Sequence, residues 1–136
     1  MDAETRSEIE RTAAFRSELR RFLARTSVAT NEVGLTPQRY DLLLMVGSAP
    51  EARTTVTELC NALQLRQTAV TELVKRATDA GLVMREPSAD DARVSFVKLT
   101  PEGERRLLRV FEMLREDRSA FAEAFQLLQR RFNAAE

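Results

Sequence analysis

The stretch between Thr55 and Thr100 limits the fold of this chain more than any other part of the sequence. It holds two short amphipathic patterns with a brief break between them, followed by two β-prone runs joined by a polar segment. That order predicts a helix, a turn, a second helix and then a β-hairpin. On either side of the stretch, the apolar residues recur at the spacing of long helices.

The two short patterns have clear helix signals. Thr55 and Glu58 match a capping box at the start of the first helix. The second helix starts at Arg66 and ends at Gly81. The predicted buried faces consist of Leu59, Ala62 and Leu63 in the first helix and of Val70, Leu73, Val74 and Ala77 in the second. Two short amphipathic helices separated by about three or four residues are the signature of a helix-turn-helix.

The hairpin is predicted from residues 82–86 and 94–99, which are both β-prone. The connection between them reads Pro-Ser-Ala-Asp-Asp-Ala-Arg and forms a polar tip that ends at Arg93. Asp91 is expected to pair with an arginine and to fix the shape of this tip. The alternative is a surface turn with incidental charges.

Helices are predicted before and after this stretch. An amphipathic pattern covers residues 4–33 and stops at Gly34, as expected of a helix C-cap glycine. Thr36 and Pro37 then start a helix over about residues 37–46.

After Thr100 and Pro101 the chain reads as helix nearly to its end, with a coiled-coil-like seam that Arg118 interrupts. We interpret the interruption as a joint between two terminal helices. The seam consists of Leu107, Phe111, Leu114, Arg118, Phe121, Phe125, Leu128 and Phe132. Six of the seven phenylalanines lie in the first and last helices, which predicts that these helices form a two-fold homodimer.

We therefore expect a single domain over residues 1–136, mainly α-helical with a small β-hairpin wing. Residues 37–100 would form a winged helix-turn-helix. Residues 1–33 and 101–136 would form the long N- and C-terminal dimerisation helices.

Composition excludes several classes of protein. The sequence has no histidine and one cysteine, Cys60, which removes most metal sites and all Cys/His nucleophile pairs. We expect no catalytic residue, no metal and no cofactor. No apolar run approaches the length of a membrane span, and no signal peptide is apparent, so the prediction is a cytoplasmic protein without a membrane partner. The formal net charge is zero, which leaves nucleic-acid binding open because the placement of basic side chains decides it.

Three segments resemble the MarR family of transcriptional regulators. Residues 59–83 resemble its helix-turn-helix, and the Gly-Leu-Thr at residues 34–36 with the Gln-Arg-Tyr at residues 38–40 resembles its second-helix entry. Asp91-Ala-Arg93 followed by Leu99-Thr100 and Gly103 resembles its wing signature. The resemblance implies a homodimer with intertwined terminal helices that binds a pseudo-palindromic DNA operator. It further implies repression as the usual outcome, and release by a small ligand or an oxidant.

In a helix-turn-helix the second helix enters the major groove of double-stranded DNA, and here that recognition helix covers about residues 66–80. Contacts are also expected from the wing, about residues 82–99. The predicted contacts come from Arg66, Gln67, Thr68, Thr71, Lys75, Arg76 and Arg93. The resemblance implies base or backbone contacts for Thr68 and Thr71 and the wing contact for Arg93, which could reach a minor groove. The alternative for the helix is a solvated polar face.

The sequence departs from the family pattern at three positions. Arg66 stands where the family often has a serine cap, so the recognition helix should start less firmly. Glu72 stands where a basic or neutral residue is frequent; its carboxylate costs affinity unless it is paired, or it reads cytosine. Ala77 replaces a common leucine. Residues 66–98 contain six basic and five acidic side chains, which predicts modest and strongly salt-dependent DNA affinity.

Four residues are candidates for an effector pocket: Phe15, Phe22, Arg39 and Tyr40. Such a pocket would take a small aromatic or apolar molecule, whereas ordinary core packing is the alternative for each residue. Cys60 is expected to be a buried small hydrophobe rather than a redox sensor.

The rival hypothesis is a dimeric winged-helix module for ligand or protein binding in which DNA binding is weak or lost. The sequence leaves open the operator, the effector, the regulated genes and the choice between activation and repression.

Overall fold

The computed structural model describes the backbone of residues 1–133 and the side chains of residues 1–129. The side chain of Phe132, a predicted seam residue, lies outside the described part. Residues 134–136, which are predicted to be helical, lie outside it altogether. The elements are α1 (Ala3–Glu32), α2 (Pro37–Ser48), the 3-10 turn η1 (Pro50–Ala52), β1 (Arg53–Thr54), α3 (Val56–Leu63), α4 (Gln67–Asp79), β2 (Val83–Pro87), β3 (Ser95–Leu99), α5 (Pro101–Met113) and α6 (Arg115–Asn133). The fold is mainly helical with a small antiparallel sheet, as predicted.

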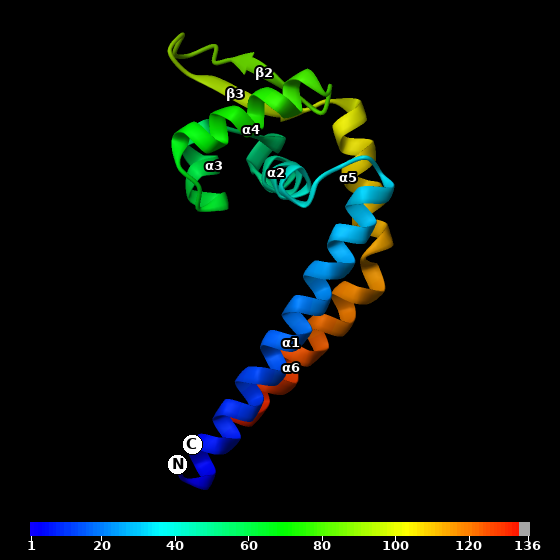
Figure 1. Ribbon diagram of the computed structural model, residues 1–136. Coiled ribbons are helices and arrows are strands. Elements are labelled where there is room, and N and C mark those ends of the chain that lie inside the picture. Colours follow the sequence, from blue (N-terminus) through cyan, green and yellow to red (C-terminus); the bar gives the residue numbers. More distant parts are fainter. Residues whose placement is uncertain (134–136) are drawn as a thin grey trace. The chain divides into compact units, whose positions relative to one another are not determined.

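The chain forms two compact units. One consists of residues 1–29 and the described residues from Phe111 onward, and the other of residues 30–110. In the second unit, α2 packs against α3, α4 and β3, and the β2–β3 hairpin follows α4 (Figure 1). The fully buried side chains of this unit include Leu42, Leu43, Val46, Leu59, Val70, Val83 and Val97. These residues form one apolar core that holds the two short helices against the hairpin.

The predicted helix starts are confirmed. Thr36 caps α2 by accepting a hydrogen bond from the backbone N–H of Arg39 at 3.1 Å, with Pro37 in the first helical position. At α3 the capping box is complete: the Thr55 Oγ1 accepts from the Glu58 N–H, and the Glu58 carboxylate accepts from the Thr55 N–H, both at 3.2 Å.

The sheet has three strands rather than the two that we predicted. Its order is β1-β3-β2, and β1 pairs with β3 through Arg53 opposite Lys98 and Thr54 opposite Val97. A strand of two residues is too short to show alternation. It also directly follows Glu51 and Ala52, whose φ angles of 59° and 54° are those of an irregular turn. The region therefore reads as a loop in the sequence.

The predicted core position Ala62 on α3 is wrong, since its side chain is exposed. Of the other two predicted core residues of this helix, Leu59 is fully buried and Leu63 is half-buried. The predicted inner face of α4 (Val70, Leu73, Val74, Ala77) is buried throughout.

A polar joint ties α4 to the hairpin and to α5. The hydroxyl of Thr100 donates to the carbonyl oxygen of Gly81 at 2.5 Å and accepts from the N–H of Gly103 at 3.0 Å. The Thr100 N–H donates to the carbonyl oxygen of Leu82 at 3.1 Å. Gly103 packs so closely that an added Cβ would overlap the Leu82 carbonyl. The joint fixes the end of β3 against the end of α4, and so fixes the wing relative to the recognition helix.

The other unit pairs α1 with α6, which lie side by side (Figure 1). Phe121 packs against Phe15 and Phe22, with ring centroids 5.9 and 5.2 Å apart, and Phe125 packs against Phe15 at 5.8 Å. The predicted joint is present, since α5 ends at Met113 and α6 begins at Arg115. Several large apolar side chains of this unit remain exposed: Ile9, Leu23, Val28, Phe111, Met113, Phe125 and Leu127.

At that joint Arg118 turns back on the preceding helix. Its Nη1 donates to the carbonyl oxygen of Phe111 at 2.7 Å, and its guanidinium lies 3.7 Å from the centre of the Phe111 ring. A charged donor at a helix C-terminus satisfies a carbonyl that has no partner within the helix. The arginine that breaks the apolar seam thus has a structural partner.

Candidate nucleic-acid interface

The outer face of α4 is polar and exposed. Thr68, Thr71 and Lys75 are all exposed, as are Gln67 and Arg76. The same helix buries its four apolar residues on the opposite side. The predicted division between a core face and a polar face is confirmed, whereas contact of the polar face with DNA stays a prediction.

The start of α4 lacks a side-chain cap. Arg66 occupies the N-cap position without a capping hydrogen bond from its side chain, which is the weaker start expected where serine is absent. The turn before it contains Gln64, which adopts a left-handed conformation with φ of 53°. The first N–H groups of α4 therefore lack a side-chain acceptor at the N-cap, a position that favours an anion.

Glu72 is paired on this face. Its Oε1 accepts a hydrogen bond from the Nε of Arg76 at 3.0 Å, one helical turn further along. Both side chains are more than half exposed, so the pair adds little to stability. Its consequence is electrostatic, because the carboxylate that departs from the family pattern does not face a phosphate backbone uncompensated.

The wing tip is fixed by local hydrogen bonds. The Asp91 Oδ1 accepts from the backbone N–H of Arg93 at 3.0 Å and from its Nε at 3.2 Å, and the Ser88 Oγ accepts from the N–H groups of Asp90 and Asp91. The hydrogen bonds from the backbone and then the side chain of Arg93 hold the pKa of Asp91 below its usual value. The Arg93 side chain is 91% exposed. The expected pairing of Asp91 with an arginine is present, and the tip presents a guanidinium to solvent.

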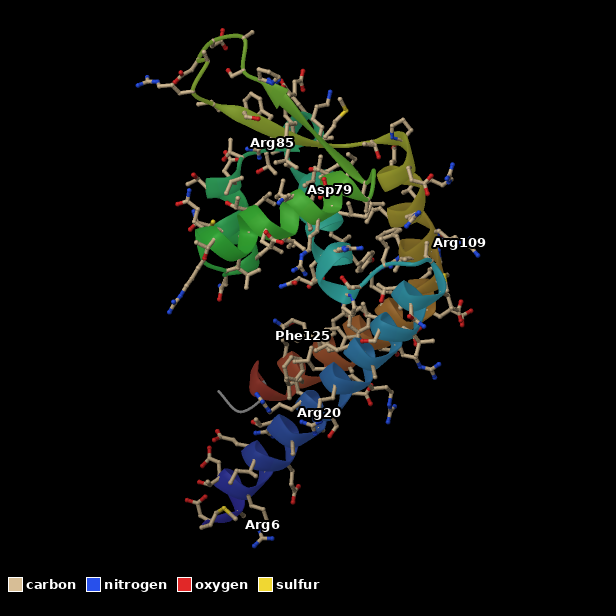
Figure 2. All side chains as sticks on the ribbon, turned by 45° about the horizontal axis from the view of Figure 1, so that its top comes forward. Arg6, Arg20, Asp79, Arg85, Arg109 and Phe125 are labelled. Atoms are coloured by element: carbon tan, nitrogen blue, oxygen red, sulfur yellow. The ribbon has the colours of Figure 1, made fainter. Side chains whose placement is uncertain are left out.

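The sequence interpretation missed Arg85. This residue lies on β2 opposite Val97, whose side chain is fully buried, and therefore on the sheet face that meets α4. A hollow of about 490 Å³ lies between the two elements and is lined in part by Gln67, Thr71, Lys75 and Arg85. Figure 2 shows Arg85 on its strand close to Asp79 of α4. Strand alternation from the buried Val83 could have placed Arg85 on this face, because residues two apart share a face.

The four effector-pocket candidates lie in different surroundings. Phe15 and Phe22 pack on Phe121 within the α1–α6 unit, where Phe15 also lines a hollow of about 300 Å³. Arg39 is half-buried and Tyr40 is buried, and both lie on α2 in the other unit. A shared pocket for these residues stays a prediction.

Other functional classes gain no support from the described residues. Among them, no group of three or more Cys, Asp or Glu side chains is arranged to hold a metal ion. Cys60 is half-buried on α3 rather than fully buried as expected. Within residues 1–133, none of the helices has the length and apolarity needed to span a membrane.

A short capped helix, an exposed second helix and a hairpin locked beside it define a winged helix-turn-helix protein. Residues 33–94 match the family model described as MarR family. The matched residues include those of the helix-turn-helix and of the wing tip, so the family match agrees with the resemblance noted in the sequence.

Solved structures share the fold over nearly the whole chain. A MarR family transcription regulator superposes with a TM-score of 0.77 at 24% identity, covering 97% of this chain and 93% of that chain. A mutant of E. coli MarR complexed with operator DNA gives 0.73 at 18% identity, covering 99% of each chain. A mutant of S. aureus MepR bound to an oligodeoxyribonucleotide gives 0.71 at 16% identity, covering 92% and 97%. No curated protein matches the sequence.

Proposed function

We propose that this protein is a transcription regulator that binds double-stranded DNA through α4 and the β2–β3 wing. The observation that carries the proposal is the polar outer face of α4, which the Thr100 joint fixes beside a wing whose tip exposes Arg93. Helix and wing of this kind read the major groove and an adjacent minor groove. The MarR family match and the DNA complexes of the E. coli and S. aureus proteins support the same function and argue against an enzyme.

Arg85 extends the proposed interface. Arg85 of β2 and Lys75 of α4 both line the hollow between these elements, so two cations lie on the wing side of the recognition helix. Basic side chains beside a recognition helix contact phosphates and set its register without reading sequence. Together with Arg66 and Arg93 they would supply most of the salt-dependent affinity.

We further propose that the protein acts as a homodimer on a pseudo-palindromic operator. The support is the exposed apolar surface of α1 and α6, including Leu23 at 54% and Leu127 at 54% exposed. Apolar surface of this extent on paired helices marks a protein interface, and a two-fold dimer is its commonest form. Repression, with release by a small molecule, is the outcome that the family resemblance implies, and a reporter gene downstream of the operator would test both.

The pairing of Glu72 with Arg76 bears on the rival module that has lost DNA binding. Glu72 and the neutral total charge were the features that favoured that alternative. Because Arg76 compensates the carboxylate, Glu72 is no longer an argument against a DNA interface.

DNA binding can be tested by fluorescence anisotropy with the DNA that flanks the protein's own gene. We expect Arg93→Ala to weaken binding about tenfold, since it removes an exposed cation at the wing tip. Arg109→Ala is the matched control, because Arg109 is an exposed arginine on α5, away from the α4 face and the wing (Figure 2). Equal binding by both variants and the unaltered protein would contradict the proposed interface, whereas weak or absent binding by the unaltered protein would favour the rival module.

A further inference from the structure

Glu72 lies in the middle of the exposed face of α4. Thr68, Glu72 and Lys75 are four and three residues apart, so they form one stripe along the helix. This stripe is opposite the buried side of the helix, which consists of Val70, Leu73, Val74 and Ala77. Lys75 borders the wing-side edge of the helix, because it lines the hollow together with Gln67, Thr71 and Arg85. A helix that inserts with this stripe foremost brings Glu72 to the base edges rather than to the phosphates.

Arg76 holds the Glu72 side chain in a defined position. The Nε of Arg76 donates a 3.0 Å hydrogen bond to Oε1 of Glu72. The two oxygens of a carboxylate can accept several hydrogen bonds, so this contact leaves Glu72 able to accept more. The Glu72 side chain is 54% exposed, so its Oε2 retains acceptor capacity toward solvent. The Arg76 guanidinium uses one of its five donors in this contact, which leaves it able to bind a phosphate or guanine as well.

A carboxylate in the major groove discriminates strongly among the bases. Cytosine presents only an amino donor there, whereas guanine and thymine present acceptors that would repel it. Adenine presents its amino group beside the N7 acceptor, a pattern that suits an amide better than a carboxylate. Cytosine is therefore the base that an exposed, prepositioned Glu72 fits.

We propose that Glu72 is a specificity-determining residue that accepts a hydrogen bond from the N4 amino group of a cytosine in each operator half-site. Arg76 is its positioning residue. The inference rests on the proposed DNA-binding function and adds to it the base that the recognition helix selects.

Selection from random double-stranded DNA tests the inference with the full-length protein. For the unaltered protein we expect a C·G pair at one position of each half-site, preferred about tenfold over other pairs. Glu72→Gln should move the preference at that position to adenine, because the amide forks to N6 and N7. Glu72→Ala should abolish the preference at that position and leave the other positions unchanged. Arg76→Met should weaken the preference for cytosine at the same position.

Glu104→Gln provides the matched charge control, because Glu104 is an exposed carboxylate on α5. It should select the same sequences as the unaltered protein. If the Glu72→Gln and Glu72→Ala variants both still select cytosine at that position, the inference is wrong. The proposed function would remain intact. Failure of the unaltered protein to enrich any DNA would overturn the proposed function and the inference with it.

Discussion

Gly81 and Gly103 both bond to Thr100, and each position requires glycine for a different physical reason. Gly81 has a φ of +74° and open space where a Cβ would lie, so its requirement is conformational. Gly103 lies within a helix, and its requirement is steric, because the Leu82 carbonyl occupies the place of a Cβ. The wing signature glycine is thus explained by packing rather than by a turn.

We expect Gly103→Ala to lower the free energy of unfolding by about 3 kcal/mol, because backbone rather than a flexible side chain must move. Gly81→Ala should cost about 1 kcal/mol, the usual penalty of a left-handed alanine. Chemical denaturation of both variants measures the difference. Equal losses of unfolding free energy in the two variants would show that the Leu82 carbonyl does not exclude a side chain at position 103.

Asp91 shapes the wing tip through its charged form. Its pKa is lowered by the hydrogen bonds from Arg93, so the contribution is present above the usual value of 3.8 and is lost as the pH falls through the lowered folded-state pKa. We expect the Arg93 backbone amide to be equally ordered from pH 7 to about pH 5 and to become mobile only in stronger acid. Asp91→Asn should mobilise it at every pH. NMR order parameters measure this, and an ordered tip in the variant would contradict the assigned role.

At the scale of elements, the residue at the start of α4 affects both the stability of the helix and the positive charge available for DNA. Arg66 brings a cation to the N-cap but forms no capping hydrogen bond with its side chain. Arg66→Ser should stabilise the protein by about 1 kcal/mol through the added cap, yet weaken DNA binding by removing a phosphate contact. Arg66→Ala should weaken DNA binding similarly without the gain in stability. Thermal unfolding and anisotropy on the same samples separate the two effects, and a serine variant with undiminished affinity would exclude Arg66 from the interface.

Elements whose determinants are local could be predicted from the sequence. The Thr55–Glu58 capping box and the Asp91–Arg93 pair join residues two or three apart, so their spacing alone predicts them. Strand β1 could not be predicted, because its two residues are strand only through pairing with β3, far along the chain. Alternation from Val83 could have placed Arg85 on the inner face of the sheet, whereas its place opposite Val97 depends on the pairing of β2 with β3.

At the scale of the whole molecule, the exposed apolar residues of α1 and α6 predict a dimer. Leu23→Glu places a charge on this surface without disturbing a buried residue, because Leu23 is 54% exposed. We expect the variant to sediment as a monomer and to lose most of its operator affinity, since half-site spacing then no longer favours binding. Leu108→Glu, at a similarly exposed leucine of the other unit, is the control. A variant that stays dimeric would place the interface elsewhere.

The charge balance of the winged part makes the proposed DNA interface dependent on a few cations. Six basic side chains against five acidic ones within residues 66–98 give the winged part almost no net charge. The ion pairs Glu72–Arg76 and Asp91–Arg93 compensate two of those carboxylates within the surface itself. Affinity must then come from specific placement rather than from a general positive field, which predicts modest binding that salt weakens steeply.

The most direct test is the salt dependence of DNA affinity, measured by anisotropy on the DNA flanking the gene. We predict a linear fall of the logarithm of the binding constant with the logarithm of the salt concentration, and a slope reduced by about one in magnitude in Lys75→Ala or Arg85→Ala. Absence of binding at low salt, or a binding constant that does not change between low and physiological salt, would contradict a DNA interface built on α4 and the wing.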